Sequence, residues 1–539
     1  MSKQSIHCAV RSVSFGLLVT LSGGVYGGQT EDYTSGKPSS SVLGQVSTST
    51  FDGANRSGPV GAATLSGPAD VAVDPVTAKV FVADRDNNRV LRFESEEALI
   101  DGASAEAVLG QPNFITTAGA TTTSRFSDPK SIACDSSGRL WVLDGNRVLR
   151  FDGAGNKGSG GNADGVLGQP DFLDTATRTG ADGLGSPESI SISVTGTLWV
   201  SCTDLNRVVG FAEAASKSDG ADAERVFGQT DFVGSGSGTT RNTFSAPRGL
   251  AVDLAGNLYV ADSGNNRVLR FTDAEEKAAG ADADVVLGQL VFTTATAGVS
   301  DAAMDDPREL SLTPSGDLFV GDFGNQRVLL FENVSSKGDG GTADSVLGQS
   351  DFVTKLNPEG ESNIASPGGI WADGEQRVWI ADVLASRVLR FDSDQFQPDA
   401  KSGKQSTKGL KGNDRYNSSG AQQKSVIKAR GSKGEKGFFV FENDGDVTDG
   451  MQIKATKGSS KLNVKYILKQ GGNVTGEVTS QGLNVAEIPS GSSRIIEVRI
   501  KGTARSRKSS ARKTLKARVR SLTDNASDAA MIKAVKTKK

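Results

Sequence analysis

The sequence predicts an all-β protein: a six-bladed β-propeller with four strands in each blade, followed by a β-sandwich. Composition gives the first indication, because the 539 residues hold 66 glycines and only 6% aromatics, which is typical of many tight turns joining short strands. The stronger indication is an internal repeat. The tripeptide Arg-Val-(Leu/Val) recurs six times, first after 58 residues and then every 60, with its arginine at Arg89, Arg147, Arg207, Arg267, Arg327 and Arg387.

Each of the first five repeats contains four short apolar segments. In the fourth copy they are residues 249–253, 256–262, 267–271 and 286–289, separated by turn residues. Four strands per unit and six units in series predict a propeller, because each small sheet must bury both faces against its neighbours. We expect the first segment to be innermost and the last outermost. An aromatic residue precedes each motif arginine by eight positions, or by six in the second copy: Phe81, Trp141, Trp199, Tyr259, Phe319 and Trp379.

An isolated strand predicts how the ring closes. Residues 43–45 match the fourth strand of a unit but stand before the first unit, and no such segment follows the sixth unit. We expect this N-terminal strand to complete the last blade, because that pairing removes two open sheet edges.

The repeats resemble NHL repeats, most clearly in residues 249–253 and 259–268, and the array is similar to NHL six-bladed propellers over residues 42–392. The resemblance implies the fold but no single chemistry, since such propellers include RNA-binding modules, a zinc-dependent amidating lyase and uncharacterised secreted proteins. The lyases hold zinc with histidines, whereas His7 is the only histidine here. Related lactonases use calcium held by carboxylates and an asparagine.

The residue after each repeat proline is predicted to ring the channel mouth, on the face that also carries the long loops. Lys130, Arg248 and Arg308 are candidates to bind a carboxylate, phosphate or sulfate there, with Glu188 and Glu309 giving polarity to the opposite side. The alternative is that these residues are solvated charges at the starts of strands. No catalytic residue, metal ligand or required cofactor is predicted, and calcium held by Glu188, Glu309 and nearby acidic residues is the alternative.

An aspartate ends the second strand of five repeats and is predicted to pair with the motif arginine across a tight hairpin. These residues are Asp84, Asp144, Asp262, Asp322 and Asp382. Such a recurring pair fits a scaffold better than catalysis. The third repeat has Cys202 at this position, and we expect a degenerate repeat with Asp204 as a local substitute, because no histidine is available to activate the thiol.

The N-terminus is predicted to be an export signal over residues 1–28, with Lys3 and Arg11 before the apolar stretch 15–21 and small residues around 23–28; an unstructured leader is the alternative. The expected location is therefore secreted, cell-surface or periplasmic in a bacterium. No other apolar run approaches the roughly 20 residues of a membrane span. Cys134 and Cys202 lie in predicted strands, where a buried thiol is the commoner situation.

The two ends of the chain have opposite charge. Residues 1–392 carry 30 basic and 50 acidic residues, and residues 393–539 carry 30 and 13. We expect the propeller over residues 29–395, a polar linker over 396–423 and a basic sandwich over 424–539. Eight alternating segments predict an immunoglobulin-like sandwich: 425–429, 438–442, 451–455, 462–468, 483–488, 495–500, 515–519 and 531–535. Residues 438–446 resemble a strand and turn of immunoglobulin-like accessory domains of bacterial secreted proteins.

Residues 501–520 hold nine basic and no acidic residues. They are predicted either to form a strand with one solvated face or to bind an anionic polysaccharide, lipid headgroup or nucleic acid. The sequence therefore favours a non-catalytic extracellular scaffold that binds a protein or small anionic ligand on the propeller's loop face and an anionic surface through its basic domain. Nucleic acid is a less favoured partner of the acidic propeller. A calcium-dependent hydrolase or lactonase at the channel mouth is the alternative function.

Overall fold

The structure is a computed structural model in which most of the two β-rich parts of the chain are described. The described residues are 33, 35, 37–49, 52–95, 99–355, 360, 362–373, 377–392, 398–403, 424–430, 435–443, 449–459, 462–469, 472–488, 493–502, 511–521 and 527–537. The predicted export signal lies outside them.

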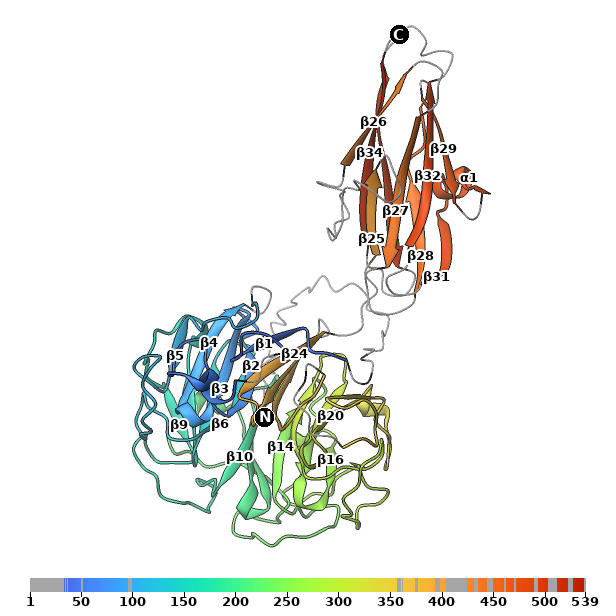
Figure 1. Ribbon diagram of the computed structural model, residues 1–539. Coiled ribbons are helices and arrows are strands. Elements are labelled where there is room, and N and C mark those ends of the chain that lie inside the picture. Colours follow the sequence, from blue (N-terminus) through green and yellow to red (C-terminus); the bar gives the residue numbers. More distant parts are fainter. Residues whose placement is uncertain are drawn as a thin grey trace, which may run out of the picture. The chain divides into compact units, whose positions relative to one another are not determined.

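Six four-stranded antiparallel sheets form the blades of a propeller, as the repeat predicts (Figure 1). Each inner strand packs beside the inner strands of both neighbouring blades, including β22 beside β2, so the sheets form a closed ring. The strands, from the inside outward, are β2 Pro68–Val73, β3 Lys79–Asp84, β4 Arg89–Ser95 and β5 Ala107–Leu109; β6 Pro129–Cys134, β7 Leu140–Asp144, β8 Arg147–Phe151 and β9 Gly165–Leu167; β10 Pro187–Ile192, β11 Leu198–Cys202, β12 Arg207–Phe211 and β13 Arg225–Phe227; β14 Pro247–Val252, β15 Leu258–Asp262, β16 Arg267–Phe271 and β17 Val285–Leu287; β18 Pro307–Leu312, β19 Leu318–Asp322, β20 Arg327–Phe331 and β21 Ser345–Leu347; β22 Pro367–Ala372, β23 Arg377–Asp382 and β24 Arg387–Asp392.

The N-terminal strand closes the sixth blade. Strand β1 (Ser41–Leu43) pairs antiparallel with β24, placing Ser41 opposite Arg390 and Leu43 opposite Val388. Val42 and Leu43 are fully buried, so the pairing both covers the sheet edge and removes apolar surface from water.

The core lies between blades. Six buried clusters each combine side chains from two adjacent blades; one contains Trp141 of β7 together with Val200 of β11. The six repeat aromatics are at most 1% exposed, and Trp199 stacks on Phe227, which stacks in turn on Phe271 of the next blade. The aromatic repeat is therefore explained by packing between neighbouring sheets.

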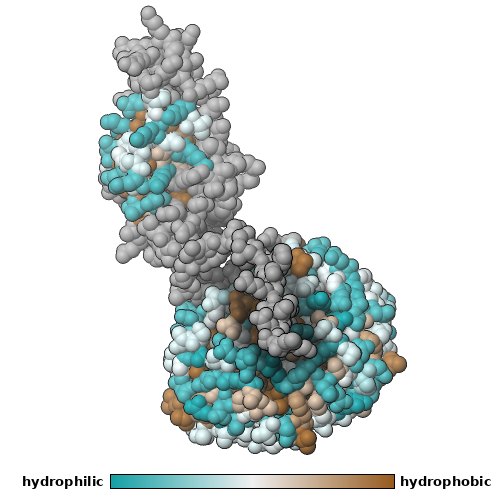
Figure 2. Space-filling view, turned by 180° about the vertical axis from the view of Figure 1, so that it is seen from behind, coloured by the Kyte–Doolittle hydropathy of each residue, from teal (hydrophilic) through white to brown (hydrophobic). Residues whose placement is uncertain are grey.

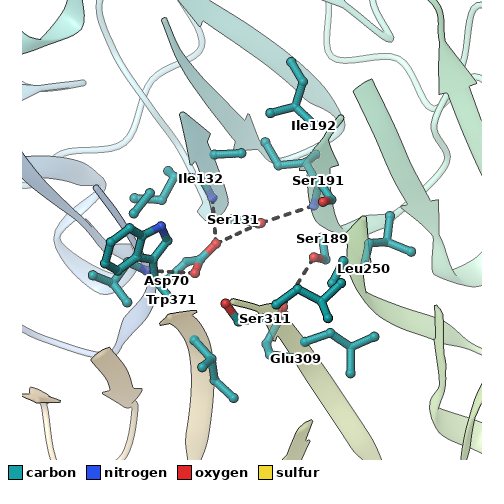
Figure 3. A pocket seen from close by; sticks show the side chains of 18 of the residues that line it. Asp70, Ser131, Ile132, Ser189, Ser191, Ile192, Leu250, Glu309, Ser311 and Trp371 are labelled. Carbon is teal, nitrogen blue, oxygen red and sulfur yellow. Dashed lines mark hydrogen bonds between the residues drawn. The ribbon is translucent and has the colours of Figure 1, made fainter. Parts of the chain in front are cut away.

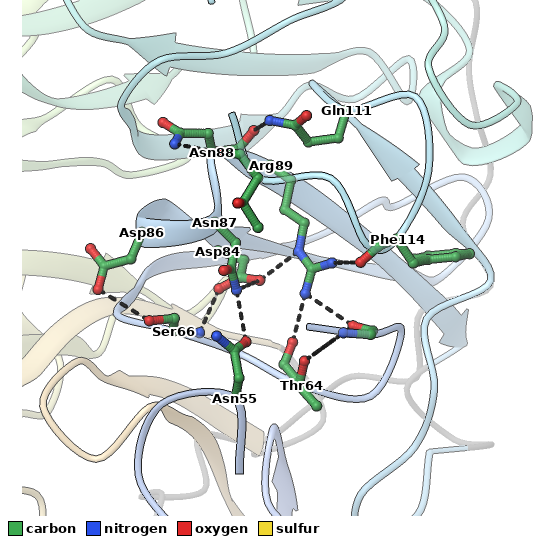
Figure 4. A network of polar contacts seen from close by, with 12 residues as sticks. Asn55, Thr64, Ser66, Asp84, Asp86, Asn87, Asn88, Arg89, Gln111 and Phe114 are labelled. Atoms are coloured by element: carbon green, nitrogen blue, oxygen red, sulfur yellow. Dashed lines mark hydrogen bonds and ion pairs between the residues drawn. The ribbon is translucent and has the colours of Figure 1, made fainter. Parts of the chain in front are cut away.

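The predicted aspartate–arginine pairs are present in five blades and are buried. In blade 1, Asp84 Oδ2 accepts a hydrogen bond from Arg89 Nε at 2.6 Å, and Asp84 Oδ1 accepts one from the backbone N–H of Ser66 (Figure 4). The guanidinium also donates to the carbonyls of Thr64 and Phe114. The ion pair thus holds together the hairpin and the two loops that contain Thr64 and Phe114. Its role is to stabilise the fold. The equivalent pairs are Asp144–Arg147, Asp262–Arg267, Asp322–Arg327 and Asp382–Arg387.

Blade 3 departs from this pattern as the sequence predicts. Cys202 replaces the aspartate, and burial raises the pKa of its thiol to about 12. Asp204 Oδ1 accepts the backbone N–H of Ser186, the residue before the repeat proline, as Asp144 Oδ1 accepts that of Asp128 in blade 2. Among the described residues no carboxylate forms an ion pair with Arg207, which donates hydrogen bonds to the carbonyls of Phe232, Gly180 and Gly183. Asp204 therefore substitutes for the loop contact only.

Short 3-10 helices join the strands at both ends of the blades. Four of them lie between the second and third strands and precede a residue in the left-handed region, which favours the recurring asparagine. The described 3-10 helices are η1 Ala54–Ser57, η2 Arg85–Asn87, η4 Ala154–Asn156, η5 Thr203–Leu205, η6 Ala214–Ser216, η7 Ser263–Asn265, η8 Ala274–Glu276, η9 Phe323–Asn325 and η10 Val334–Ser336.

The C-terminal part forms two five-stranded sheets, ordered β25-β27-β32-β29-β30 and β26-β34-β33-β28-β31. Both contribute to one buried cluster, in which Phe439 and Tyr466 of the first sheet meet Met451 and Leu515 of the second. All eight predicted strands are present. The elements are β25 Pro398–Gly403, β26 Lys424–Arg430, β27 Glu435–Asn443, β28 Asp449–Ala455, β29 Leu462–Leu468, β30 Gly472–Asn473, α1 Thr475–Thr479, β31 Leu483–Ile488, β32 Ser493–Gly502, β33 Ala511–Ser521 and β34 Ser527–Thr537.

The predicted linker over residues 396–423 is wrong at 398–403. These residues form β25, which pairs antiparallel with β27 over Pro398–Gly403 and thus belongs to the C-terminal sheets. Its polar sequence, Pro-Asp-Ala-Lys-Ser-Gly, lacks the alternation of apolar residues that identifies a strand. Strand β33 has the predicted alternation, with Leu515, Ala517 and Val519 buried and Thr514 and Lys516 more exposed. No helix in the described parts of the chain is long and apolar enough to cross a membrane.

Candidate functional site

The channel mouth is a pocket of about 210 Å³, and all five sequence-predicted site residues line it. Lys130, Glu188, Arg248 and Arg308 each follow the proline that begins an inner strand, and Glu309 comes next on β18. Because the six inner strands surround the channel, this position converges on its mouth. The other lining residues are Ala69, Arg85, Phe323, Ser366, Pro367, Gly368, Val383 and Leu384.

Most of the mouth cations have a carboxylate partner. Lys130 Nζ donates to Glu188 Oε1 at 2.7 Å and to the carbonyl of Pro187 at 3.1 Å. Arg308 forms a fork with Asp306 Oδ2 at 2.7 Å, and its guanidinium lies over the ring of Phe323. These contacts hold both side chains in place, which reduces the entropy lost on binding a ligand.

Arg248 is different. Its nearest carboxylate oxygen is Glu188 Oε2 at 3.7 Å, an ion pair beyond hydrogen-bond distance. Its Nε is buried without a hydrogen-bond partner, while the side chain keeps 29% of its surface exposed. Because an unsatisfied buried donor is costly, a guanidinium in this state favours an incoming anion that can accept from it.

Below the mouth, a second cavity of about 210 Å³ continues down the channel (Figure 3). In blades 1, 2, 3 and 5 the second residue after the repeat proline forms its upper wall: Asp70, Ser131, Ser189 and Glu309. Glu309 also lines the mouth pocket. Glu309 Oε2 accepts a hydrogen bond from Ser189 Oγ at 3.3 Å. Burial raises the pKa of Glu309 well above its usual range, and the nearby carboxylates of Asp70 and Glu188 raise it further.

Asp70 is the other acidic residue of the channel wall. Its carboxylate accepts the backbone N–H groups of Val71 and Ile132, at 2.7 and 2.8 Å, and the hydroxyl of Ser131 at 2.9 Å. Burial raises the pKa of Asp70 to about 7, and these three hydrogen bonds act against that rise. Since Ser131 and Ile132 belong to the next blade, Asp70 ties blades 1 and 2 together.

Two glycines complete this level of the wall. A Cβ on Gly249 would lie 2.2 Å from the carbonyl oxygen of Arg308, and one on Gly369 would lie 1.9 Å from Asp70 Oδ1. Both distances are impossible for real atoms, so glycine is required where these inner strands approach their neighbours.

A groove of about 290 Å³ lies beside the mouth, between blades 2 and 3, and shares Lys130 with it. The hairpin of blade 2 is two residues shorter than the others, with only Gly145 and Asn146 between Asp144 and Arg147. In blade 4 the corresponding turn contains Asn265, whose side chain donates to Asp262 and to the carbonyl of Gly238. The shorter turn lacks such a side chain and leaves the groove open.

No group of three or more histidine, cysteine or acidic residues converges to hold a metal among the described residues. Glu188, which the calcium alternative would use, accepts from Lys130 and lies near Arg248.

Sequence reasoning placed the five residues on one face but missed half of the mouth. Arg85, Phe323 and Val383 each follow the aspartate that ends a second strand, and Leu384 comes one residue later. The signal was present in the alignment of repeats: this position is Arg85, Gly145, Thr203, Ser263, Phe323 and Val383 around the ring. Because the residue at this position differs between blades, the propeller fold does not require a particular side chain there.

A family model for the NHL repeat matches residues 244–271, which contain β14, β15 and β16 of blade 4. Over 280 residues the chain is 23% identical to teneurin-3 of Danio rerio, in 48% of this chain and 10% of that protein. The chain thus spans about a tenth of the length of this curated relative.

Solved structures with a similar arrangement include a streptogramin B lyase and a gluconolactonase from Xanthomonas campestris. The lyase is 13% identical with a TM-score of 0.35, over 60% of this chain and 93% of its own. The gluconolactonase is 13% identical with a TM-score of 0.37, over 66% of this chain and 98% of its own. A likeness of this size says nothing about what this chain binds.

Proposed function

We propose that the propeller is a non-catalytic binding scaffold whose channel mouth captures the anionic group of a ligand. The observation that carries the proposal is the guanidinium of Arg248, which lines the pocket with Nε buried and makes no hydrogen bond to any described residue. Arg85, Lys130 and Arg308 add three positive charges to the same pocket. A carboxylate, phosphate or sulfate accepts from such donors in a fork geometry.

The fixed positions of Lys130 and Arg308 support this function further. Lys130 is held by Glu188, and Arg308 is held by Asp306. The pocket is therefore preorganised, and ligand binding has to immobilise few side chains. The ligand's anion supplies hydrogen-bond acceptors to Arg248, which has none among the described residues. In this respect the mouth differs from the five buried aspartate–arginine pairs, in which every arginine is already bonded to its carboxylate.

Calorimetric titration of the full chain with sodium sulfate tests the proposal. Arg248→Gln should weaken sulfate binding by about 10- to 100-fold, since hydrogen bonds to charged groups contribute about 1.5–3 kcal/mol. Arg139→Gln is the control, because Arg139 is similarly exposed, at 35%, but lies at the opposite end of the inner strands. Equal sulfate binding by wild type and Arg248→Gln would reject the proposal, as would its absence in the wild type.

For the C-terminal domain, we infer association with an anionic surface outside the cell, after export directed by residues 1–28. The excess of basic residues over 393–539 supports this role. Full-chain protein should bind vesicles containing anionic lipid at low salt and release from them as salt rises. Replacing Arg505, Arg507 and Lys508 by Gln should shift release to lower salt; unchanged release would contradict the assignment.

A further inference from the structure

The mouth pocket has two chemically different halves. Blades 1 to 4 supply its charged side, with Arg85, Lys130, Glu188 and Arg248, and blades 5 and 6 supply an apolar side. The apolar side consists of Phe323, Pro367, Val383 and Leu384. Arg308 lies between the two halves, stacked on Phe323.

Two residues of the apolar half stand at positions where other blades have a hydroxyl that hydrogen-bonds to the next inner strand. In blade 3, Thr203 Oγ1 donates to the carbonyl of Pro247 on the next inner strand, at 2.6 Å, and in blade 4 Ser263 does the same to Pro307. Phe323 and Val383 occupy the equivalent positions of blades 5 and 6 and have no hydroxyl to donate. These two blades therefore present apolar surface where a linking hydrogen bond would suit the fold alone.

Leu384 extends this departure to the rim of the pocket. It is 72% exposed, and the equivalent positions of blades 1 and 3 hold Asp86 and Asp204. Single exposed aliphatic residues are ordinary, and in the view of Figure 2 hydrophobic residues on the propeller surface form small patches among hydrophilic ones. Leu384 differs because it shares one cavity with Phe323 and Val383.

We infer that the ligand is a small organic anion whose single carboxylate binds at Arg248 and whose short apolar group lies against Phe323, Val383 and Leu384. This inference rests on the proposed function and names its ligand class. A cavity of about 210 Å³ is below the range of pockets for drug-sized ligands, so the apolar group is a few carbons long. A doubly charged inorganic anion such as sulfate has no apolar group to contact the apolar half of the pocket.

Chain-length dependence of binding tests the inference. Full-length protein is titrated with acetate, butyrate, hexanoate and octanoate, and separately with inorganic sulfate. Affinity should rise by up to about fourfold for each methylene that the pocket buries, and then level off once the apolar half is filled. Leu384→Ser should flatten this rise.

Leu254→Ser is the matched control. Leu254 is 64% exposed and follows the end of β14 that is remote from the mouth, so its replacement should preserve the full chain-length dependence. Sulfate and acetate binding as tightly as octanoate would overturn the inference and leave the proposed function standing. If none of these anions binds, both fail. A chain-length effect that survives Leu384→Ser, and also Val383→Thr, would overturn the assigned position of the apolar group.

Discussion

The hydroxyl of Ser189 on β10 donates a hydrogen bond to Glu309 Oε2 on β18 at 3.3 Å, linking blade 3 to blade 5. Blade 4 lies between them, and its residue at this level is Gly249, which has no side chain in the way. The bond fixes Glu309 at the junction of the mouth pocket and the channel. The protonation state of Glu309 should therefore affect how tightly the mouth pocket binds an anion.

Sulfate affinity should therefore fall as pH rises. Because the pKa of Glu309 is raised, its carboxyl is neutral at pH values where a free glutamate is charged. As pH rises through the raised pKa, a negative charge appears in the pocket and repels the anion. Titrations between pH 5.5 and 9, where the charge of sulfate is constant, should show the fall, and Glu309→Gln should remove most of it. A profile unaffected by Glu309→Gln would contradict the placement of this charge.

Restoring the buried ion pair in blade 3 should stabilise the propeller. Cys202→Asp combined with Asp204→Gly gives blade 3 the arrangement of blade 4, in which Asp262 binds Arg267 at 2.7 Å. We expect a gain of about 1–2 kcal/mol, because a charge-assisted hydrogen bond replaces a thiol contact. Thermal unfolding measures it. The reverse change, Asp262→Cys, should cost about 3 kcal/mol or more by leaving Arg267 unpaired; equal stability of all three proteins would disprove the argument.

Closure of the ring should depend on β1. Val42→Asp buries a charge in the sixth blade, where Val42 is fully enclosed, and should cost several kcal/mol or prevent soluble expression. Val46→Asp introduces the same charge four residues later at a position that is 52% exposed, and should change stability by less than about 0.5 kcal/mol. Denaturant unfolding compares the two variants, and similar midpoints would show that β1 does not hold the ring closed.

Gly369 should tolerate no side chain. A Cβ there would lie 2.4 Å from the Cα of Asp70, so Gly369→Ala must push β22 away from β2. We expect a loss of about 3 kcal/mol or more. At Gly158 no atom lies within 4 Å of the added Cβ, and Gly158→Ala should be neutral. Comparable unfolding midpoints for the two variants would mean that these strands separate without cost.

Most of the fold could be predicted because each blade repeats the same physical solution. The spacing of Arg89 and its five counterparts gave the number of blades, and the isolated segment at residues 43–45 gave the closing strand. Strand β25 was missed because its six residues are mainly polar. It forms because β27 offers a sheet edge, and pairing of that kind leaves no pattern in the strand's own sequence.

The candidate site could be predicted in part. Lys130 and Arg248 were found because residues after the repeat proline vary in an otherwise regular array. Phe323 and Leu384 were missed because apolar residues in a sequence are attributed to the core by default. Which carboxylate each cation meets depends on side-chain direction, so the unmade hydrogen bonds of Arg248 could be identified only in the structure.

The pairing of β1 with β24 also sets the order in which the protein can fold during synthesis. Ser40 and Arg390, which are hydrogen-bonded to each other, are 350 positions apart. The ribosome makes β1 before every other strand of the propeller and β24 after all of them, so Val42 and Leu43 have no partner strand while five blades are completed. A nascent chain in that state exposes an apolar strand and an open sheet edge together. Because residues 393–539 follow β24, the ring can close, and the need for protection from aggregation can end, while the C-terminal sheets are still being made.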